Sequence, residues 1–320
     1  MPRREGAQGC RRGPLVAAGT LCHRGPMDAV TEPRDTSMTV RDGRTVAWTD
    51  WGEPDGAPLL RVPGTPGCRW SVRVDRTPWA ERGLRVVTTE RPGFGASTRL
   101  PGRRFREHAD DLAEVLDHLG LDRVHLIGGS GSAPHELALC QYHPDRVAAA
   151  TVVAGATPLQ EDEVDAMIPL NAQVWRLVRA GRVDDAAAVM APLRESMLAD
   201  PLGAFRTVMD TAPPEDLALM EDPTWRKGFA RATVEALRAG LDGWVDEACA
   251  LDLEWDVDPS AVTTSVTWYH AVEDRNCPIS AARRLVAALP RGRLVEWTDA
   301  GHLTAYHFEG EILDELLARG

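Results

Sequence analysis

The chain has 320 residues, of which 43% are hydrophobic, so it can bury a sizeable core in one large domain or two small ones. Lys227 is the single lysine among 36 basic residues, which leaves almost no candidate for Schiff-base catalysis or a phosphate-binding P-loop. The formal net charge of −12 argues against a phosphate-backbone partner, so we expect no nucleic-acid partner.

The N-terminal segment differs in charge from the rest of the chain. Residues 1–26 hold five arginines and one glutamate, a balance of +4, which leaves −16 for the remainder. The apolar stretch Leu15–Ala18 is too short for a secretory signal, and no run reaches the roughly 18 residues of a membrane span. We therefore expect residues 1–36 to be a disordered or non-native extension, and we expect no membrane partner.

The six cysteines show neither a CxxC pair nor the spacing of metal ligands. Scattered thiols without a disulfide framework are typical of a reducing compartment. The sequence therefore predicts a cytoplasmic protein without a metal site, and it leaves the oligomeric state open.

Short apolar runs alternate with helical patterns along the first half of the chain. Two alternating runs joined by Asp42-Gly43 predict a hairpin over residues 37–51. An apolar stripe from Arg104 to Leu119 predicts an amphipathic helix. Buried strands are predicted at Leu59–Val62, Leu84–Thr89, Val124–Ile127 and Ala148–Val153. This alternation indicates an α/β fold with a mostly parallel sheet.

The strand pattern stops over residues 157–259, where helical segments broken by prolines follow one another. It resumes with strands at Ser265–Tyr269 and Leu294–Trp297 and with helices at Ser280–Leu289 and Phe308–Ala318. We predict a core of residues 37–156 and 260–320, interrupted by a helical cap of residues 157–259.

The segment Gly128-Gly129-Ser130-Gly131-Ser132 follows a predicted strand and opens an apolar helix. A serine between small residues at such a turn is typical of a nucleophile elbow, because larger flanking side chains would collide with the neighbouring backbone. The alternative is a glycine-rich dinucleotide or phosphate turn. That pattern lacks its last glycine here, and no lysine is available for a P-loop.

A serine hydroxyl is a weak nucleophile and needs a base that is itself oriented by a carboxylate. In this architecture the acid and the histidine follow the serine, each on a loop after a later strand. Asp274 lies after the Ser265–Tyr269 strand, with Glu273 as a less favoured neighbour, and His302 lies after the Leu294–Trp297 strand. The predicted catalytic residues are therefore Ser130, Asp274 and His302, and the other histidines are assigned to packing or to helix surfaces.

From Thr39 to the C-terminus, the sequence resembles the α/β-hydrolase family. The family's acid usually precedes x-x-x-Pro, as Asp274 precedes Pro278, and its histidine usually follows a glycine, as His302 follows Gly301. The resemblance implies an α/β-hydrolase fold of the serine hydrolase or esterase type: a mostly parallel central sheet, flanking helices, an inserted helical cap and no cofactor.

The oxyanion hole requires two backbone N–H groups. Gly131, which follows the nucleophile, supplies one. Residues 63–67 resemble the family's His-Gly-x-Pro-Gly loop, which implies that Thr65 donates the second. Pro63 stands where histidine is common, so an imidazole that usually supports this loop is missing. Residues 90–97 resemble another family loop, which we expect to be structural.

The predicted cap is rich in methionine and aromatic side chains, which either line an apolar pocket for an acyl or aryl group or form the core of the cap itself. These residues are Met167, Met190, Met197, Met209, Met220, Trp175, Phe205, Trp225, Phe229 and Trp244. The acidic run Glu161-Asp162-Glu163, with Asp165, permits a comparison with proline aminopeptidases of the family, whose cap carboxylates hold the substrate amine. That branch has tryptophan after the serine, whereas this chain has Gly131.

The leading hypothesis is a cofactor-free serine hydrolase whose partner is a small-molecule acyl substrate, a small carboxylic ester or a related compound. Ser130 attacks, His302 moves the proton, Asp274 orients the imidazole, and Thr65 and Gly131 hold the oxyanion. The same triad would also serve an iminopeptidase-like aminopeptidase, a C–C bond hydrolase or a natural-product tailoring enzyme. A non-catalytic binding protein of the same fold is the alternative from another class, although such proteins often lose a triad member.

Overall fold

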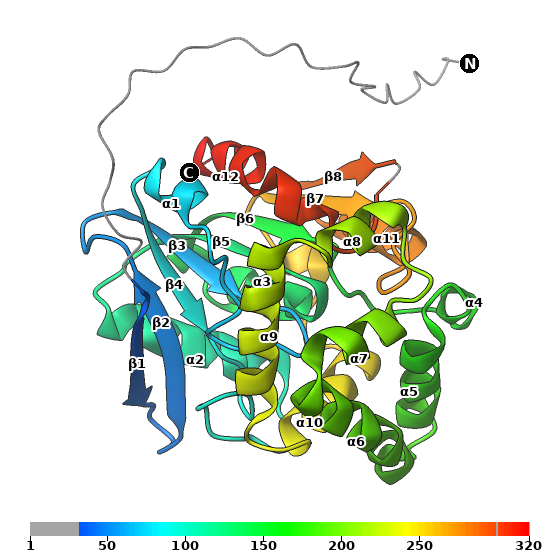
Figure 1. Ribbon diagram of the computed structural model, residues 1–320. Helices are drawn as coiled ribbons and strands as arrows, with labels where there is room; N and C mark the ends of the chain where they lie inside the picture. The colour runs from blue at the N-terminus through cyan, green and yellow to red at the C-terminus, as the bar shows by residue number, and fades with distance from the viewer. Residues whose placement is uncertain (1–31, 299, 320) are drawn as a thin grey trace, which may run out of the picture. The chain divides into compact units, whose positions relative to one another are not determined.

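A computed structural model describes residues 32–298 and 300–319 of the chain (Figure 1). Most of the predicted N-terminal extension lies outside this range. The predicted boundary at residue 36 is wrong, because the first strand already begins at Arg34 and its first residues pair with Asp50 and Thr49. This strand lies at the edge of the sheet and its side chains are mostly exposed, so it lacks the apolar signal of a buried strand.

The central layer is an eight-stranded sheet with the order β1-β2-β4-β3-β5-β6-β7-β8. β2 is antiparallel to both β1 and β4, and the strands from β4 across to β8 run parallel. The strands are β1 (Arg34–Thr39), β2 (Thr45–Trp51), β3 (Ala57–Val62), β4 (Leu84–Thr89), β5 (Val124–Gly129), β6 (Val147–Val153), β7 (Val266–Ala271) and β8 (Gly292–Trp297). The predicted mostly parallel α/β sheet is confirmed.

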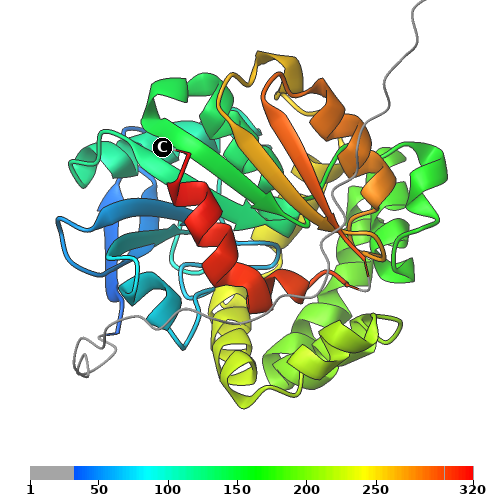
Figure 2. The same cartoon turned by 90° about the horizontal axis from the view of Figure 1, so that it is seen from above.

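Helices cover both faces of the sheet because neighbouring strand residues alternate between two cores. Leu60 and Leu126 belong to one apolar cluster, whereas Leu59 and Ile127 belong to the other. The first cluster packs against α2 (Phe105–His118), α3 (Ala133–Tyr142) and α11 (Ile279–Ala288). The second packs against α1 (Thr77–Ala80) and α12 (Glu309–Leu317), and Figure 2 shows α12 lying across that face.

All described regular structure between β6 and the turn before β7 is helical, and seven α-helices are inserted there. They are α4 (Glu161–Val164), α5 (Pro169–Arg179), α6 (Val183–Ala199), α7 (Pro201–Val208), α8 (Pro214–Leu219), α9 (Pro223–Leu237) and α10 (Asp242–Asp252). The other described helical elements are short 3-10 helices at Ser130–Ser132, Pro144–Arg146, Pro259–Ala261 and Thr304–Phe308. Within the described residues, the insertion and the sheet domain form one compact unit, so the insertion packs onto the sheet domain and is not a separate body.

Several of the inserted helices begin with a proline at their first position, which explains why the segment is rich in prolines and yet helical. Pro169, Pro201, Pro214 and Pro223 each stand at a helix start, where the missing N–H would have had no intrahelical partner. Within residues 32–298 and 300–319, no helix combines the length and the apolar character that crossing a membrane requires.

Candidate active site

Ser130 lies at the sharp turn between β5 and α3. Its φ angle is +55°, in the left-handed region that residues with side chains rarely adopt. The Ser130 carbonyl accepts a hydrogen bond from the backbone N–H of Ala156, at 2.8 Å, which ties the turn to the segment after β6. The structure thus places Ser130 on the strained strand-to-helix turn that the sequence predicts.

The glycines around Ser130 are required because other chain segments approach closely. A Cβ atom on Gly129 would lie 2.2 Å from the Val153 carbonyl oxygen, and one on Gly131 would lie 2.2 Å from Thr65 Oγ1. Ser132 takes the place of a further glycine and is completely buried. Its hydroxyl accepts a hydrogen bond from the Gly129 N–H at 2.6 Å and so closes the turn.

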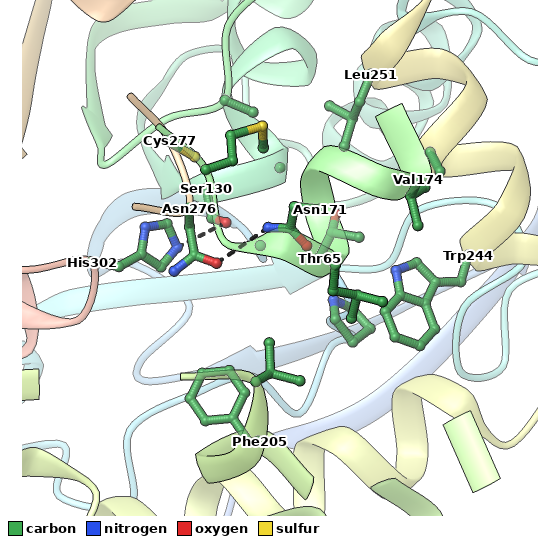
Figure 3. Close-up of a pocket in the computed structure, with 18 of the residues that line it drawn as sticks. Thr65, Ser130, Asn171, Val174, Phe205, Trp244, Leu251, Asn276, Cys277 and His302 are labelled. Atoms are coloured by element: carbon green, nitrogen blue, oxygen red, sulfur yellow. Dashed lines mark hydrogen bonds between the residues drawn. The ribbon is translucent and has the colours of Figure 1, made fainter. Parts of the chain in front are cut away.

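The structure brings the three predicted catalytic side chains together in one hydrogen-bonded chain. His302 Nε2 lies 3.0 Å from Ser130 Oγ, and His302 Nδ1 lies 2.8 Å from Asp274 Oδ2. Figure 3 shows the imidazole of His302 directed toward Ser130. Asp274 is buried, whereas the neighbouring Glu273 is exposed, so Asp274 is the carboxylate that meets the histidine.

The electrostatics of this chain suit a histidine that accepts a proton from a serine. Burial disfavours ionisation of Asp274, but His302 and the backbone N–H of Cys277 outweigh it, and the pKa of Asp274 is lowered. Burial also disfavours the imidazolium of His302, yet the Asp274 carboxylate raises the pKa of His302. An ionised carboxylate only accepts hydrogen bonds, so Nδ1 carries the proton and Nε2 is free to accept one from Ser130.

His270, which the sequence assigns to packing, supports the loop of Asp274. Trp268 Nε1 donates to His270 Nδ1 at 3.0 Å, so the Nε2–H of His270 donates to the Cys277 carbonyl at 2.7 Å. Burial lowers the pKa of His270, which keeps the ring neutral in this arrangement. The side chain lies on the strand that precedes Asp274, and only its position on that strand points to this role.

Asp216, at the start of α8, reaches the histidine loop from the cap. Its Oδ1 accepts a hydrogen bond from the Leu303 N–H at 2.9 Å, and its carboxyl is completely buried. A Cβ atom on Gly301 would lie 2.3 Å from Asp216 Oδ2, so the glycine before His302 makes room for this carboxylate. No sequence signal connects Asp216 with His302, because the two residues belong to different parts of the fold.

Thr65 lies beside the nucleophile turn, on the loop that follows β3. A Cβ atom on Gly131 would lie 3.4 Å from the Thr65 nitrogen, and one on Gly64 would lie 3.0 Å from Ser130 Cβ. The two predicted oxyanion donors, Thr65 and Gly131, are therefore neighbours in space. This placement agrees with the role that the resemblance implies for them.

The buried side chain of Arg91 supports the Thr65 loop, where Pro63 supplies no imidazole. It donates to the carbonyl of Pro63, to the carbonyl of Gly64 at 2.7 Å and to Thr65 Oγ1 at 2.8 Å. Arg91 belongs to the segment 90–97 that the sequence predicts to be structural. In this protein the Arg91 guanidinium therefore supports the loop, in place of an imidazole at position 63.

Glu247 on α10 joins the cap to the same loop. Thr65 Oγ1 donates to Glu247 Oε1 at 3.2 Å, and Arg91 Nε lies 3.2 Å from the same oxygen. Arg103 and His135 complete the ring of partners around this fully buried carboxylate. Burial opposes ionisation, but the two arginines hold the pKa of Glu247 well below its usual range. A cap helix is thereby fixed to the predicted oxyanion loop.

A cavity of about 350 Å³ extends from Ser130 and His302 into the cap. Of the cap residues named from the sequence, some line it and the rest pack elsewhere. The lining ones are Met167, Met190, Met197, Phe205, Phe229 and Trp244. Met209, Met220 and Trp225 form an apolar cluster within the cap, and Trp175 belongs to another. Both sequence interpretations therefore hold, each for part of the set.

Asp274, Cys277 and His302 offer ligand atoms within 4.8 Å of one another, which is a spacing compatible with a metal ion. Two of the three groups already bind each other in the hydrogen-bonded chain of Ser130. Burial raises the pKa of the Cys277 thiol far above its usual range, whereas a metal needs the thiolate. This donor set does not fit a metal ion as well as it fits the serine-histidine-aspartate chain.

Comparison with known proteins supplies the family. The chain is 29% identical over 124 residues to a bifunctional esterase/perhydrolase of Acinetobacter calcoaceticus, which is 38% of this chain and 45% of that protein. It is 26% identical over 271 residues to the 2-hydroxy-6-oxononadienedioate/2-hydroxy-6-oxononatrienedioate hydrolase of Burkholderia vietnamiensis, which is 82% of this chain and 87% of that protein. Several other matches span half or less of the curated relative's length.

Solved structures and a family model agree with these relatives. The crystal structure of a hydrolase from Pseudomonas aeruginosa superposes with a TM-score of 0.63 at 19% identity, covering 88% of this chain and 96% of that one, and so shows the shared fold. The family model described as alpha/beta hydrolase fold matches residues 57–307, well over half of the chain. The chain therefore belongs to the α/β-hydrolase fold family.

Proposed function

We propose that this protein is a serine hydrolase that cleaves a small carboxylic ester or a related acyl compound through an acyl-enzyme. The single observation that carries the proposal is the hydrogen-bonded chain from Ser130 through His302 to buried Asp274, at one end of a cavity with a largely apolar lining. A nucleophile, its base and the carboxylate that orients the base are in contact before any substrate binds.

The geometry supports a two-step reaction. His302 Nε2 takes the proton of Ser130 as Oγ attacks the substrate carbonyl, and the oxyanion that forms accepts hydrogen bonds from the N–H groups of Thr65 and Gly131. The imidazolium then protonates the leaving alcohol, which leaves the acyl group on Ser130. Water attacks this ester with His302 as base, and the acid and the free serine are released.

The lining of the cavity disfavours a dicarboxylate substrate. The name of the Burkholderia relative specifies dioate substrates, which carry two carboxylates. Among the described residues that line this cavity there is no lysine or arginine to bind a second carboxylate, and Asp252 would repel it. This argues against a substrate of the relative's charge type.

The acidic run that permits the comparison with aminopeptidases lies outside the cavity. Glu161 and Asp162 are exposed, and Glu163 is buried against Arg284 at 2.5 Å. None of the three is among the residues that line the cavity. The acidic run is thus not placed to bind a substrate amine, and we favour the esterase.

Labelling with a fluorophosphonate probe and turnover of a para-nitrophenyl ester test the proposal. The wild-type protein should be labelled on Ser130, and Ser130→Ala should lose both labelling and about four to six orders of magnitude in kcat. Ser260→Ala, at an exposed serine far along the chain, is the control and should retain both. A wild-type protein that resists labelling, or undiminished labelling of Ser130→Ala, would contradict the proposal and favour a binding protein of the same fold.

A further inference from the structure

The cavity contains one charged side chain that the proposed reaction does not use. Asp252, the last residue of α10, lines the cavity together with its neighbours Leu251 and Ala248. Among the described residues that line the cavity, Asp252 and His302 are the only ones of the types Asp, Glu, Lys, Arg and His. Most of the other lining side chains are apolar. Figure 3 shows Leu251, Val174 and Trp244 on the side of the cavity away from His302.

Asp252 differs from the other carboxylates of its helix. Asp242 and Asp246 pair with Arg99, and Glu247 has four polar partners. Within the described part of the chain, the carboxyl of Asp252 makes no hydrogen bond and no ion pair. The positive charge that acts on it belongs to Arg179, which is exposed and lies over the ring of Trp175.

The ionised form of a carboxyl without a partner beside apolar walls is energetically unfavourable. Burial raises the pKa of Asp252 to about 7, and the negative charge of Glu247 acts in the same direction, against the opposing effect of Arg179. A partially desolvated carboxyl without a partner gains more from a new hydrogen bond than an exposed one does. The cavity thus offers a strong acceptor to whatever enters it.

Resting on the proposed function, we propose that Asp252 binds a hydrogen-bond donor, a hydroxyl or an amine, carried by the acyl part of the substrate at a distance from the scissile carbonyl. The reacting carbonyl lies at Ser130, and the apolar lining from Phe205 and the cap methionines accommodates the intervening carbon chain. A hydroxyl can pair with either protonation state of the carboxyl, and an ammonium pairs with the ionised one. The substrate class is therefore an ω-hydroxy or ω-amino acyl ester.

A panel of para-nitrophenyl esters with matched chain lengths tests this assignment. Each length is supplied with an unsubstituted, an ω-hydroxy, an ω-amino and an ω-carboxy end, and kcat/KM is measured for the wild-type protein, Asp252→Leu and Asp252→Asn. At the best length, the wild-type protein should prefer the hydroxy or the amino ester over the unsubstituted one by about ten- to a hundredfold. The ω-carboxy ester should be the poorest substrate.

The variants separate recognition by Asp252 from a general effect on folding. Asp252→Leu should lose the preference and hydrolyse the unsubstituted ester at least as well as the wild-type protein. Asp252→Asn, which cannot ionise, should keep selectivity for the hydroxy ester and lose selectivity for the amino ester. Glu254→Gln removes an exposed carboxylate just beyond the same helix and should behave as the wild-type protein. Equal selectivity in the wild-type protein and Asp252→Leu, or a preference for the ω-carboxy ester, would overturn the inference.

A binding measurement keeps this inference distinct from the proposed hydrolysis. Hexylamine and hexanol are titrated calorimetrically into the Ser130→Ala protein and into the same protein with Asp252→Leu added. At least one of the two ligands should bind about tenfold more tightly when Asp252 is present. A labelled, active enzyme without this difference refutes the Asp252 site alone. A protein that resists labelling but shows the difference refutes the proposed reaction and retains the site.

Discussion

The two ends of the cavity are built in different ways. At the sheet end, Ser130, His302 and Asp274 stand on short loops after β5, β8 and β7, and each is fixed by hydrogen bonds of 2.8 to 3.0 Å or by a strained backbone. At the cap end, Met190 and Met197 contribute flexible apolar side chains. Fixed polar geometry suits the chemistry common to acyl substrates, whereas an apolar wall can change its shape with little cost.

The separation between the two ends is incomplete, because cap carboxylates reach the sheet end. Glu247 bonds to the Thr65 loop, and Asp216 holds the backbone of Leu303 beside His302. The cap therefore contributes to the position of the predicted oxyanion donor and of the proposed base. Substitutions at the sheet end should change kcat, and substitutions at the cap wall should change selectivity. Substitutions of the cap residues Glu247 and Asp216 should change the kinetics of the sheet end, in kcat or in its pH dependence.

Among the substitutions that compare the two ends of the cavity, loss of the Asp274 carboxylate should have the largest effect. Asp274→Asn should lower kcat by about three to four orders of magnitude, because an amide cannot hold the required tautomer of His302. Hydrolysis of an activated ester under saturating substrate measures the loss. Glu273→Gln, at the exposed neighbouring position, is the matched control and should change kcat by less than about twofold. An equal loss in both variants would show that the loop, and not the carboxylate, was disturbed.

Disruption of the link between α10 and the Thr65 loop should have the next largest effect. Glu247→Gln weakens the bonds to Arg91 and Thr65, and we expect kcat to fall by about ten- to a hundredfold with a smaller change in KM. Asp246→Asn is the control: it breaks the ion pair between Asp246 of α10 and Arg99, which is more exposed than the contacts of Glu247. This variant should leave kcat unchanged. If both variants lose kcat equally, the cap acts through its general attachment and not through this loop.

Changes to the cap wall should alter selectivity by a smaller factor. Phe205→Leu removes part of an aromatic side chain that lines the cavity. The variant should therefore hydrolyse esters with longer acyl chains, with a kcat/KM about three- to tenfold higher than that of the wild-type protein. Turnover of the acetyl ester serves as the internal control and should stay within about twofold of the wild-type value. A matching loss for every chain length would mean that Phe205 acts on the sheet end of the cavity.

The pH dependence should show a small effect of Asp216. The proposed reaction requires neutral His302, so kcat/KM should fall as the pH drops through the raised pKa of His302. Asp216→Asn removes a negative charge that helps to raise this pKa, and the acid limb of the profile should move to lower pH. Exposed Glu215→Gln should leave the limb in place. A limb that does not move, or that moves to higher pH, would argue against a charged Asp216 beside His302.

Features that depend on local pattern can be predicted from the residues alone. Apolar runs predict the parallel strands, and Ser130, Asp274 and His302 are predicted as partners because in this architecture the acid and the histidine follow the serine on loops after later strands. The edge strand β1 was placed too late because its exposed side chains carry no apolar signal. The sequence predicts that the imidazole that usually supports the Pro63 loop is absent, and no sequence pattern indicates that Arg91 supports the loop instead.

The side chains that complete the site from distant parts of the chain are defined only by the packing of the folded protein. Arg91 replaces the missing imidazole, and Glu247 and Asp216 come from helices of the insertion. Asp252 is distinguished from its helix neighbours only by the absence, within the described residues, of a partner for its carboxyl. These contacts join residues far apart in the chain, and no local periodicity or spacing encodes them. The physical reason is that burial and pairing of a charge depend on how the cap packs against the sheet, which only the folded chain defines.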